Sequence, residues 1–119
     1  MTYAAPIDIS IGDVIKLEVS AFTATTGIAI INNETKNKSV MQRFSSTHEL
    51  CKKDVMWGVQ LDDQYTLAHF GVLAFTNAEA YVGSSVYTPA GARLMQMVHN
   101  NQALVTPSAH DDASLTLVQ

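Results

Sequence analysis

Hydrophobic and polar residues alternate along several short segments of this 119-residue chain. In residues 13–22, Ile15, Leu17 and Val19 alternate with charged or small polar residues. A period of two residues is typical of strands with one buried face. Residues 27–33 form an apolar run, a turn rich in Asn and Lys follows, and a second strand pattern returns. We therefore predict a hairpin over residues 27–45.

The segment KKDVMWGVQL, residues 52–61, also divides into two faces and predicts a strand. One face is wholly apolar and holds Val55, Trp57, Val59 and Leu61. The other face is mixed and holds Asp54, Met56, Gly58 and Gln60. An acid, a glycine and a methionine are an unusual set for a solvated surface, so this second face is a candidate for function.

Further strand patterns occupy residues 65–75, 78–87, 92–99, 103–106 and 114–119. Turn-forming residues separate them, and no segment has a convincing helical period. The best helical candidate, residues 90–98, is flanked by Pro89 and contains Gly91, which favours a strand. Many short strands at regular spacing predict an all-β fold, a sandwich or a barrel. The length predicts one domain, residues 1–119.

Composition narrows the function classes. Apolar residues make up 47% of the chain, which is enough to build a core, and the formal net charge is −4. The longest basic run is Lys52-Lys53, so nucleic acid is not an expected partner. Since no apolar run approaches the roughly 20 residues of a membrane span, no membrane association is expected either.

The sequence predicts a cytoplasmic location. The N-terminal residues MTYAAPIDIS show no signal-peptide pattern, and Cys51 is the sole cysteine, so no disulfide can form within the chain. Two N-glycosylation sequons occur, at Asn33 and Asn37. Without a secretory route both are expected to stay unmodified.

Metal and cofactor chemistry are not expected. His48, His69, His99 and His110 lack the spacing of a zinc site, and a lone Cys51 gives no thiolate pair. Lys52 and Lys53 beside Cys51 could favour the reactive thiolate form of its side chain, but the favoured interpretation of Cys51 is a small apolar residue at a strand end.

The order of several motifs resembles a known family. A strand opened by Gly-Asp is followed by a Thr-x-Gly, an Asn-x-Thr hairpin and a Phe-Ser. Leu-Cys, the MWGVQL segment, FGVLAFTNAEA and PAGARLMQM come next. From about residue 9 to the end, this order is similar to the C-terminal part of the glutamic peptidases, the eqolisin family of fungi.

The resemblance implies two antiparallel sheets packed as a concanavalin-like jelly roll, with an active site on the concave sheet. The family cleaves peptides in acid with a glutamate and a glutamine. The glutamine lies in an N-terminal part of the fold that this chain does not match. The glutamate position falls at Met56, and a second acid of the family falls at Gln60. Because a thioether cannot act as a general base, the resemblance implies a protein that is not a peptidase.

We therefore expect the concave cleft to bind a small, largely apolar organic molecule, as in fungal secondary metabolism. An enzyme form would catalyse an isomerisation, a cyclisation or a lyase step. The expected binding residues are Met56, Gly58, Gln60, Met95 and Met97. The candidate acid or base residues are Asp54 and His69.

Structural explanations stand beside each of these roles. Asp54 could pair with Lys52 or Lys53, His69 could be a packed strand histidine, and the methionines could fill a core. A second hypothesis is a peptide- or carbohydrate-binding module, with Tyr81, Tyr87, Asn100 and Asn101 as candidates. A residual acid peptidase ranks third.

The resemblance also bears on assembly. The family builds its sheets from both parts of a longer chain, so 119 residues would leave strand edges or an apolar face open. We expect a homodimer, which would cover such a surface with a second copy.

Overall fold

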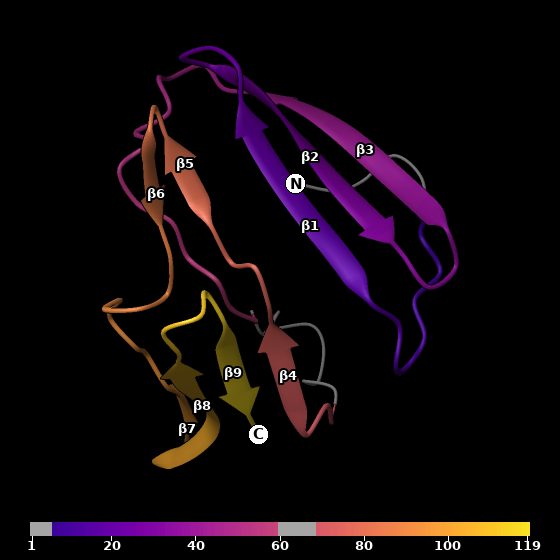
Figure 1. Ribbon diagram of the computed structural model, residues 1–119, viewed down its shortest axis with the longest axis vertical. Coiled ribbons are helices and arrows are strands. Elements are labelled where there is room, and N and C mark those ends of the chain that lie inside the picture. The colour runs from indigo at the N-terminus through magenta and orange to yellow at the C-terminus, as the bar shows by residue number, and fades with distance from the viewer. Residues whose placement is uncertain (1–5, 60–68) are drawn as a thin grey trace. The chain divides into compact units, whose positions relative to one another are not determined.

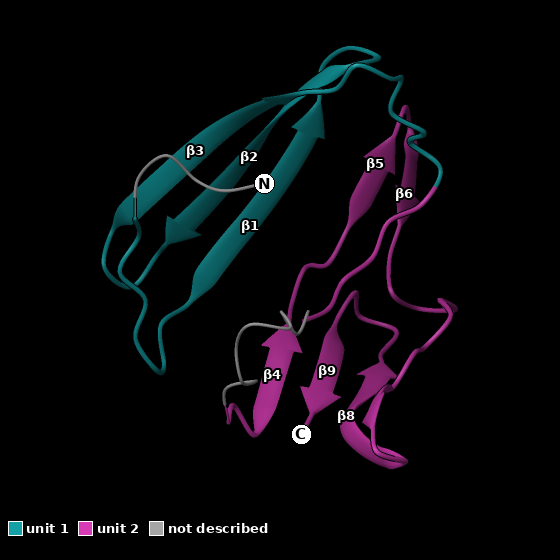
Figure 2. Cartoon of the chain, turned by 180° about the vertical axis from the view of Figure 1, so that it is seen from behind, with its two compact units in different colours: residues 1–53 teal, residues 54–119 magenta. Residues whose placement is uncertain are grey.

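The computed structural model describes residues 6–59 and 69–119, and these residues form antiparallel β-sheets (Figure 1). The chain divides into two compact units, Met1–Lys53 and Asp54–Gln119, coloured separately in Figure 2. The described residues include no helix, and therefore none that is long and apolar enough to cross a membrane. The predicted all-β class is confirmed. The prediction of one domain over residues 1–119 stays a prediction.

Three long strands build the first unit, in the order β1-β2-β3. They are β1 (Ile15–Ala21), β2 (Thr26–Asn33) and β3 (Lys38–Ser45). Their antiparallel register places Leu17 opposite Ile31, and Ile31 opposite Val40. The turn between β2 and β3 ends at Asn37, whose φ of 54° suits asparagine better than most residues. The predicted hairpin over residues 27–45 is confirmed.

One face of this sheet is apolar but poorly covered. Residues directly opposite each other in a sheet share a face, so Leu17, Val19, Ala29 and Ile31 lie together. On the central strand Ala29 is buried, whereas on the edge strand Leu17 is 59% and Val19 72% exposed. We call these four residues the apolar face of unit 1.

A glycine lets β2 fit against its neighbours in the first unit. A Cβ atom at Gly27 would come within 2.3 Å of the Phe44 ring and 2.4 Å of the Ser20 carbonyl oxygen. Because such contacts are far too short, any larger residue would push the strands apart.

The second unit holds a four-stranded sheet and a separate hairpin. The sheet order is β4 (Val72–Phe75), β9 (Leu115–Val118), β8 (Gln102–Ala109) and β7 (Met97–His99). The hairpin pairs β5 (Ala80–Val82) with β6 (Ser85–Tyr87). Two left-handed residues, Asn100 and Asn101, form the tight turn between β7 and β8.

The apolar core of the second unit lies on this sheet. Val105, Leu115 and Leu117 are at most 5% exposed. The partly buried side chains packed against them are Trp57, Val59, Phe70, Leu73, Phe75, Met97, Leu104 and Ala109. The core therefore joins all four strands of the sheet to a segment that precedes the sheet in the sequence.

The predicted strand over residues 52–61 is wrong where it can be checked. Residues 52–59 form no strand, and residues 60 and 61 lie outside the described part of the chain. The alternation is still real, because Trp57 and Val59 pack on the core while Met56 stays exposed. An extended segment can bury every second residue without the ladder hydrogen bonds that define a strand. Val55, expected in the core, is 51% exposed.

The predicted strand over residues 92–99 is shorter than expected. Only Met97–His99 pairs with β8, and the register shifts between Met97 and Val98. Residues 78–87 form two strands around a turn where one was expected, because Gly83, with a φ of 59°, provides the reversal.

Candidate functional site

The candidate site is built on residues 54–59, which we call the Trp57 segment. Trp57 and Val59 are half-buried and fix the segment on the core of the second unit. Met56, which directly precedes Trp57, is 82% exposed. Gly58 has open space where a Cβ would lie, with no atom within 4 Å. The Trp57 segment therefore has a flexible thioether and a bare backbone on its exposed side.

Asp54, the first candidate acid, is exposed at the start of the Trp57 segment. The ion pairs found among residues 6–59 and 69–119 are both made by Lys36, so Asp54 has no salt bridge to Lys52 or Lys53. The structural explanation that Asp54 pairs with a neighbouring lysine is therefore not seen. A role for Asp54 as acid or base stays a prediction.

His69 and Gln60, the other polar candidates, have less structural support. His69 is exposed directly before Phe70, which packs on the core, so the packed histidine considered as an alternative is not observed. Gln60 lies outside the described residues. Their proposed roles stay predictions.

The two methionines near β7, Met95 and Met97, differ in burial. Met97 packs against Val105, Leu115 and Leu117, as expected for a core residue. Met95 is 67% exposed. Met97 and Trp57 pack on the same core. A shared ligand-binding surface of Met56, Met95 and Met97 stays a prediction.

The residues of the alternative binding module lie on different hairpins. Tyr81 and Tyr87 belong to β5–β6 and are 67% and 55% exposed, whereas Asn100 and Asn101 form the β7–β8 turn. The Tyr81 hydroxyl donates to Glu79, and this bond raises the pKa of Tyr81. The left-handed turn gives the two asparagines a structural role.

No group of three or more His, Cys, Asp or Glu side chains suited to a metal ion occurs among the described residues. Cys51 is exposed, so its interpretation as an apolar residue at the end of a strand is wrong. Among the described residues, the preceding strand, β3, ends at Ser45, six positions before Cys51.

An open depression in the first unit was not predicted. Its volume is about 330 Å³, and its lining residues are Phe22, Thr26, Gly27, Arg43, Phe44 and Ser45. The bare Gly27 backbone helps to form it. These residues are scattered over residues 22–45 with no motif, so the sequence offered no signal for it.

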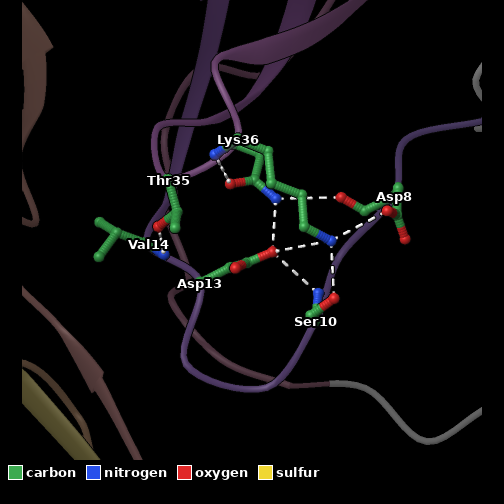
Figure 3. Close-up of polar contacts among 7 residues, drawn as sticks. Asp8, Ser10, Asp13, Val14, Thr35 and Lys36 are labelled. Carbon is green, nitrogen blue, oxygen red and sulfur yellow. Dashed lines mark hydrogen bonds and ion pairs between the residues drawn. The ribbon is translucent and has the colours of Figure 1, made fainter.

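A polar cluster around the buried Asn33 side chain of the first unit was also missed (Figure 3). Its residues are Asp8, Ser10, Asp13, Asn33 and Lys36, and we call it the polar anchor. Asn33 is fully buried; its amide nitrogen donates to Asp13 Oδ2 at 2.7 Å and to the Asp8 carbonyl oxygen at 3.0 Å. The Lys36 ammonium lies 2.9 Å from Asp8 Oδ2 and 3.5 Å from Asp13 Oδ2.

The polar anchor perturbs two charged groups. The Ser10 backbone N–H, and then the Asn33 amide, hold the pKa of Asp13 below its ordinary value. The hydrogen bond to Asp8 raises the pKa of Lys36. The anchor ties the N-terminal segment to the β2–β3 turn, and its role is structural.

Comparison with known proteins matches this chain to a peptidase family. Residues 1–118 match the Peptidase A4 family. Aspergillopepsin-2 from Aspergillus niger is 35% identical over 113 residues, which are 90% of this chain and 40% of the relative. The chain therefore spans less than half the length of that curated relative.

Solved structures give the same picture. Aspergilloglutamic peptidase from Aspergillus niger superposes with a TM-score of 0.83 at 34% identity, covering 94% of this chain and 69% of that one. Scytalido-glutamic peptidase with a peptide-based transition state analog gives 0.72 at 23% identity, covering 94% and 61%, and shows the fold alone. These proteins have a β-sandwich fold, so the predicted sandwich class is confirmed.

The comparison corrects the expected location. Aspergillopepsin-2 and aspergilloglutamic peptidase are secreted fungal peptidases, so the cytoplasmic prediction is wrong. The prediction rested on the N-terminal residues and on a single cysteine. Because the chain matches only 40% of that relative, its N-terminal residues and its cysteine count do not show in which cellular compartment the protein is located.

Proposed function

The chain belongs to the peptidase A4 family, and on that premise we propose that it binds a ligand at the Trp57 segment and does not cleave peptides. The observation that carries this proposal is Met56, an 82% exposed thioether at the position where the resemblance places the catalytic glutamate. A thioether has no proton to exchange and cannot activate water as a general base.

The chemistry of the Trp57 segment favours a small, largely apolar organic ligand, of the kind produced in secondary metabolism. Met56 is flexible and polarizable, which lets it adapt to apolar shapes. Gly58 leaves room beside it, and Trp57 holds the backbone in place. Asp54 supplies one charged group at the edge of this surface, for orientation or for acid–base chemistry in an enzyme form.

A second candidate is residual peptidase activity. It is favoured by the 35% identity to aspergillopepsin-2. That activity would need another group in place of the glutamate, and Asp54 is the nearest carboxyl in sequence to Met56. We rank this candidate second because Asp54 lies two positions before Met56, and therefore not at the position where the resemblance places the catalytic glutamate.

We also propose that a second copy of the chain covers the apolar face of unit 1. Leu17 and Val19 lie on an edge strand and are more than half exposed. Adjacent apolar residues on a strand edge are a typical association surface. A two-fold dimer would place the same face of both copies in contact.

Trp57 is the sole tryptophan of the chain, so its fluorescence reports directly on the proposed site. We would titrate the protein with three probes: camphor as a compact apolar ketone, the tripeptide Ala-Ile-His, and N-acetylglucosamine. Saturable change with camphor supports the proposal. A response to the tripeptide or the sugar alone would instead favour the peptide- or carbohydrate-binding alternative.

Met56→Glu locates the binding surface. A carboxylate there would have to lose water when an apolar ligand covers it, which is costly. We expect camphor affinity to fall at least about tenfold, or about 1.4 kcal/mol. The matched control is Met41→Glu, the same change at a 55% exposed methionine on β3, and it should leave the affinity unchanged. Equal loss in both variants would contradict the assignment.

A further inference from the structure

The corrected location reopens the question of the two sequons. Asn33-Glu34-Thr35 and Asn37-Lys38-Ser39 both match the pattern for N-linked glycosylation. They lie four residues apart at the β2–β3 turn, so sequence alone does not separate them. The structure separates them by the environment of each asparagine.

In the first sequon, the side chains of Asn33 and Thr35 both make hydrogen bonds within the folded chain. Asn33 is 0% exposed, its nitrogen donates two hydrogen bonds within the polar anchor, to Asp13 and to the Asp8 backbone, and its Oδ1 accepts from the Lys36 backbone N–H at 3.1 Å. The Thr35 hydroxyl accepts from the Val14 backbone N–H at 2.9 Å. A sugar would replace one of the two hydrogens on the Asn33 nitrogen, so one of these two hydrogen bonds would be lost. Because the side chain is fully buried, it also has no free space for a sugar, and a glycan there is incompatible with this fold.

The second sequon is open. Asn37 is exposed at the end of the turn, and Lys38 and Ser39 are exposed at the start of β3. The left-handed φ of 54° at Asn37 marks the reversal of the chain at this turn, which joins β2 and β3 in Figure 1. Asn37 precedes Lys38, the first residue of β3 that pairs with β2, so a glycan on Asn37 would not interrupt that strand pair.

We propose that Asn37 carries an N-linked glycan when this chain is made in a secretory pathway, and that Asn33 does not. The donor is a lipid-linked oligosaccharide pyrophosphate. A bond forms between Asn37 Nδ2 and C1 of the first N-acetylglucosamine as the bond from C1 to the pyrophosphate oxygen breaks. The amide loses one proton, and the lipid pyrophosphate leaves. The proposal is independent of the ligand proposed for the Trp57 segment.

The test is secretion of the full chain from yeast behind a cleavable leader, followed by enzymatic removal of N-glycans and peptide mapping. Removal converts a glycosylated asparagine to aspartate, which identifies the position. We expect a mobility shift of one glycan and conversion at Asn37 alone.

Two variants at the third position of the sequon provide the control. Ser39→Ala should abolish the shift, whereas Ser39→Thr keeps the sequon and should retain it, and neither changes Asn37. Conversion at Asn33 in folded, secreted protein would overturn the proposal. Secreted chain with no glycan at Asn37 would also overturn it.

Discussion

The two units of this chain are stabilised in different ways. The first has strands of seven or eight residues and a buried asparagine, Asn33, at the end of β2, but its apolar face is largely open. The second has mostly strands of three or four residues, yet it has a buried apolar core of Val105, Leu115 and Leu117. Long regular strands therefore do not by themselves give a core. The unit with the weaker strand pattern holds the better-buried apolar cluster.

The largest effect is expected in the second unit. Leu115→Ala removes a side chain that is 4% exposed and leaves a cavity beside Leu117. Such a change should lower the free energy of unfolding by about 2–5 kcal/mol. Urea unfolding followed by Trp57 fluorescence would measure it, since Trp57 packs on the same cluster. An unchanged midpoint would mean that this cluster is not the core.

A smaller loss is expected when the polar anchor is broken. Asn33→Ala leaves the Lys36 backbone N–H and the Asp13 carboxylate without their buried partner. We expect a cost of about 1–3 kcal/mol, measured by far-UV circular dichroism during urea unfolding. Asn32→Ala, one position earlier in β2, is the matched control and should stay within about 0.5 kcal/mol. Equal losses would show that the anchor adds nothing specific.

The sequence predicted the first unit better than the second for a physical reason. A hairpin pairs neighbouring segments, so alternation and turn residues in residues 27–45 suffice to define it. At Met56 and Trp57 the alternation correctly indicated which side is buried, but it does not show whether a pairing strand is present. Asn33 was interpreted only as a sequon because its partner Asp8 is 25 residues away, and no local pattern encodes that contact.

The stability of the two units should depend on pH in the same direction. The pKa of Asp13 is lower in the folded chain, so its contribution to stability is present above the unfolded value of about 3.9 and is lost as pH falls through the folded value. The Ser114 hydroxyl lowers the pKa of Asp112 in the second unit in the same direction. Both units should therefore lose stability in acid.

Asp13→Asn should flatten this loss in the first unit alone. Amide hydrogen exchange resolves the units, with Ile30 of β2 and Leu117 of β9 as reporters. Below about pH 4, the exchange of Ile30 should become less dependent on pH in the variant than in the wild type. The same flattening at Leu117 would show that the effect is not local to the polar anchor.

The smallest effect on stability is expected on the apolar face of unit 1. Leu17→Ala changes a side chain that is 59% exposed, so the stability of the monomer should change by no more than about 0.5 kcal/mol. The same face should govern assembly. Light scattering of the wild type should give about twice the chain mass of 12.9 kDa, and Leu17→Asp should give the monomer. A wild-type monomer at every concentration would contradict the proposed dimer.

Peptide cleavage in acid tests the central proposal most directly. The purified chain would be incubated with casein and a peptide library below about pH 4, where carboxyl groups begin to hold protons, with aspergillopepsin-2 as the positive control. Because Met56 provides no general base, we expect no cleavage above the buffer blank. Cleavage that co-elutes with the folded chain through repurification, and that disappears in Asp54→Asn, would show that the chain is a peptidase after all.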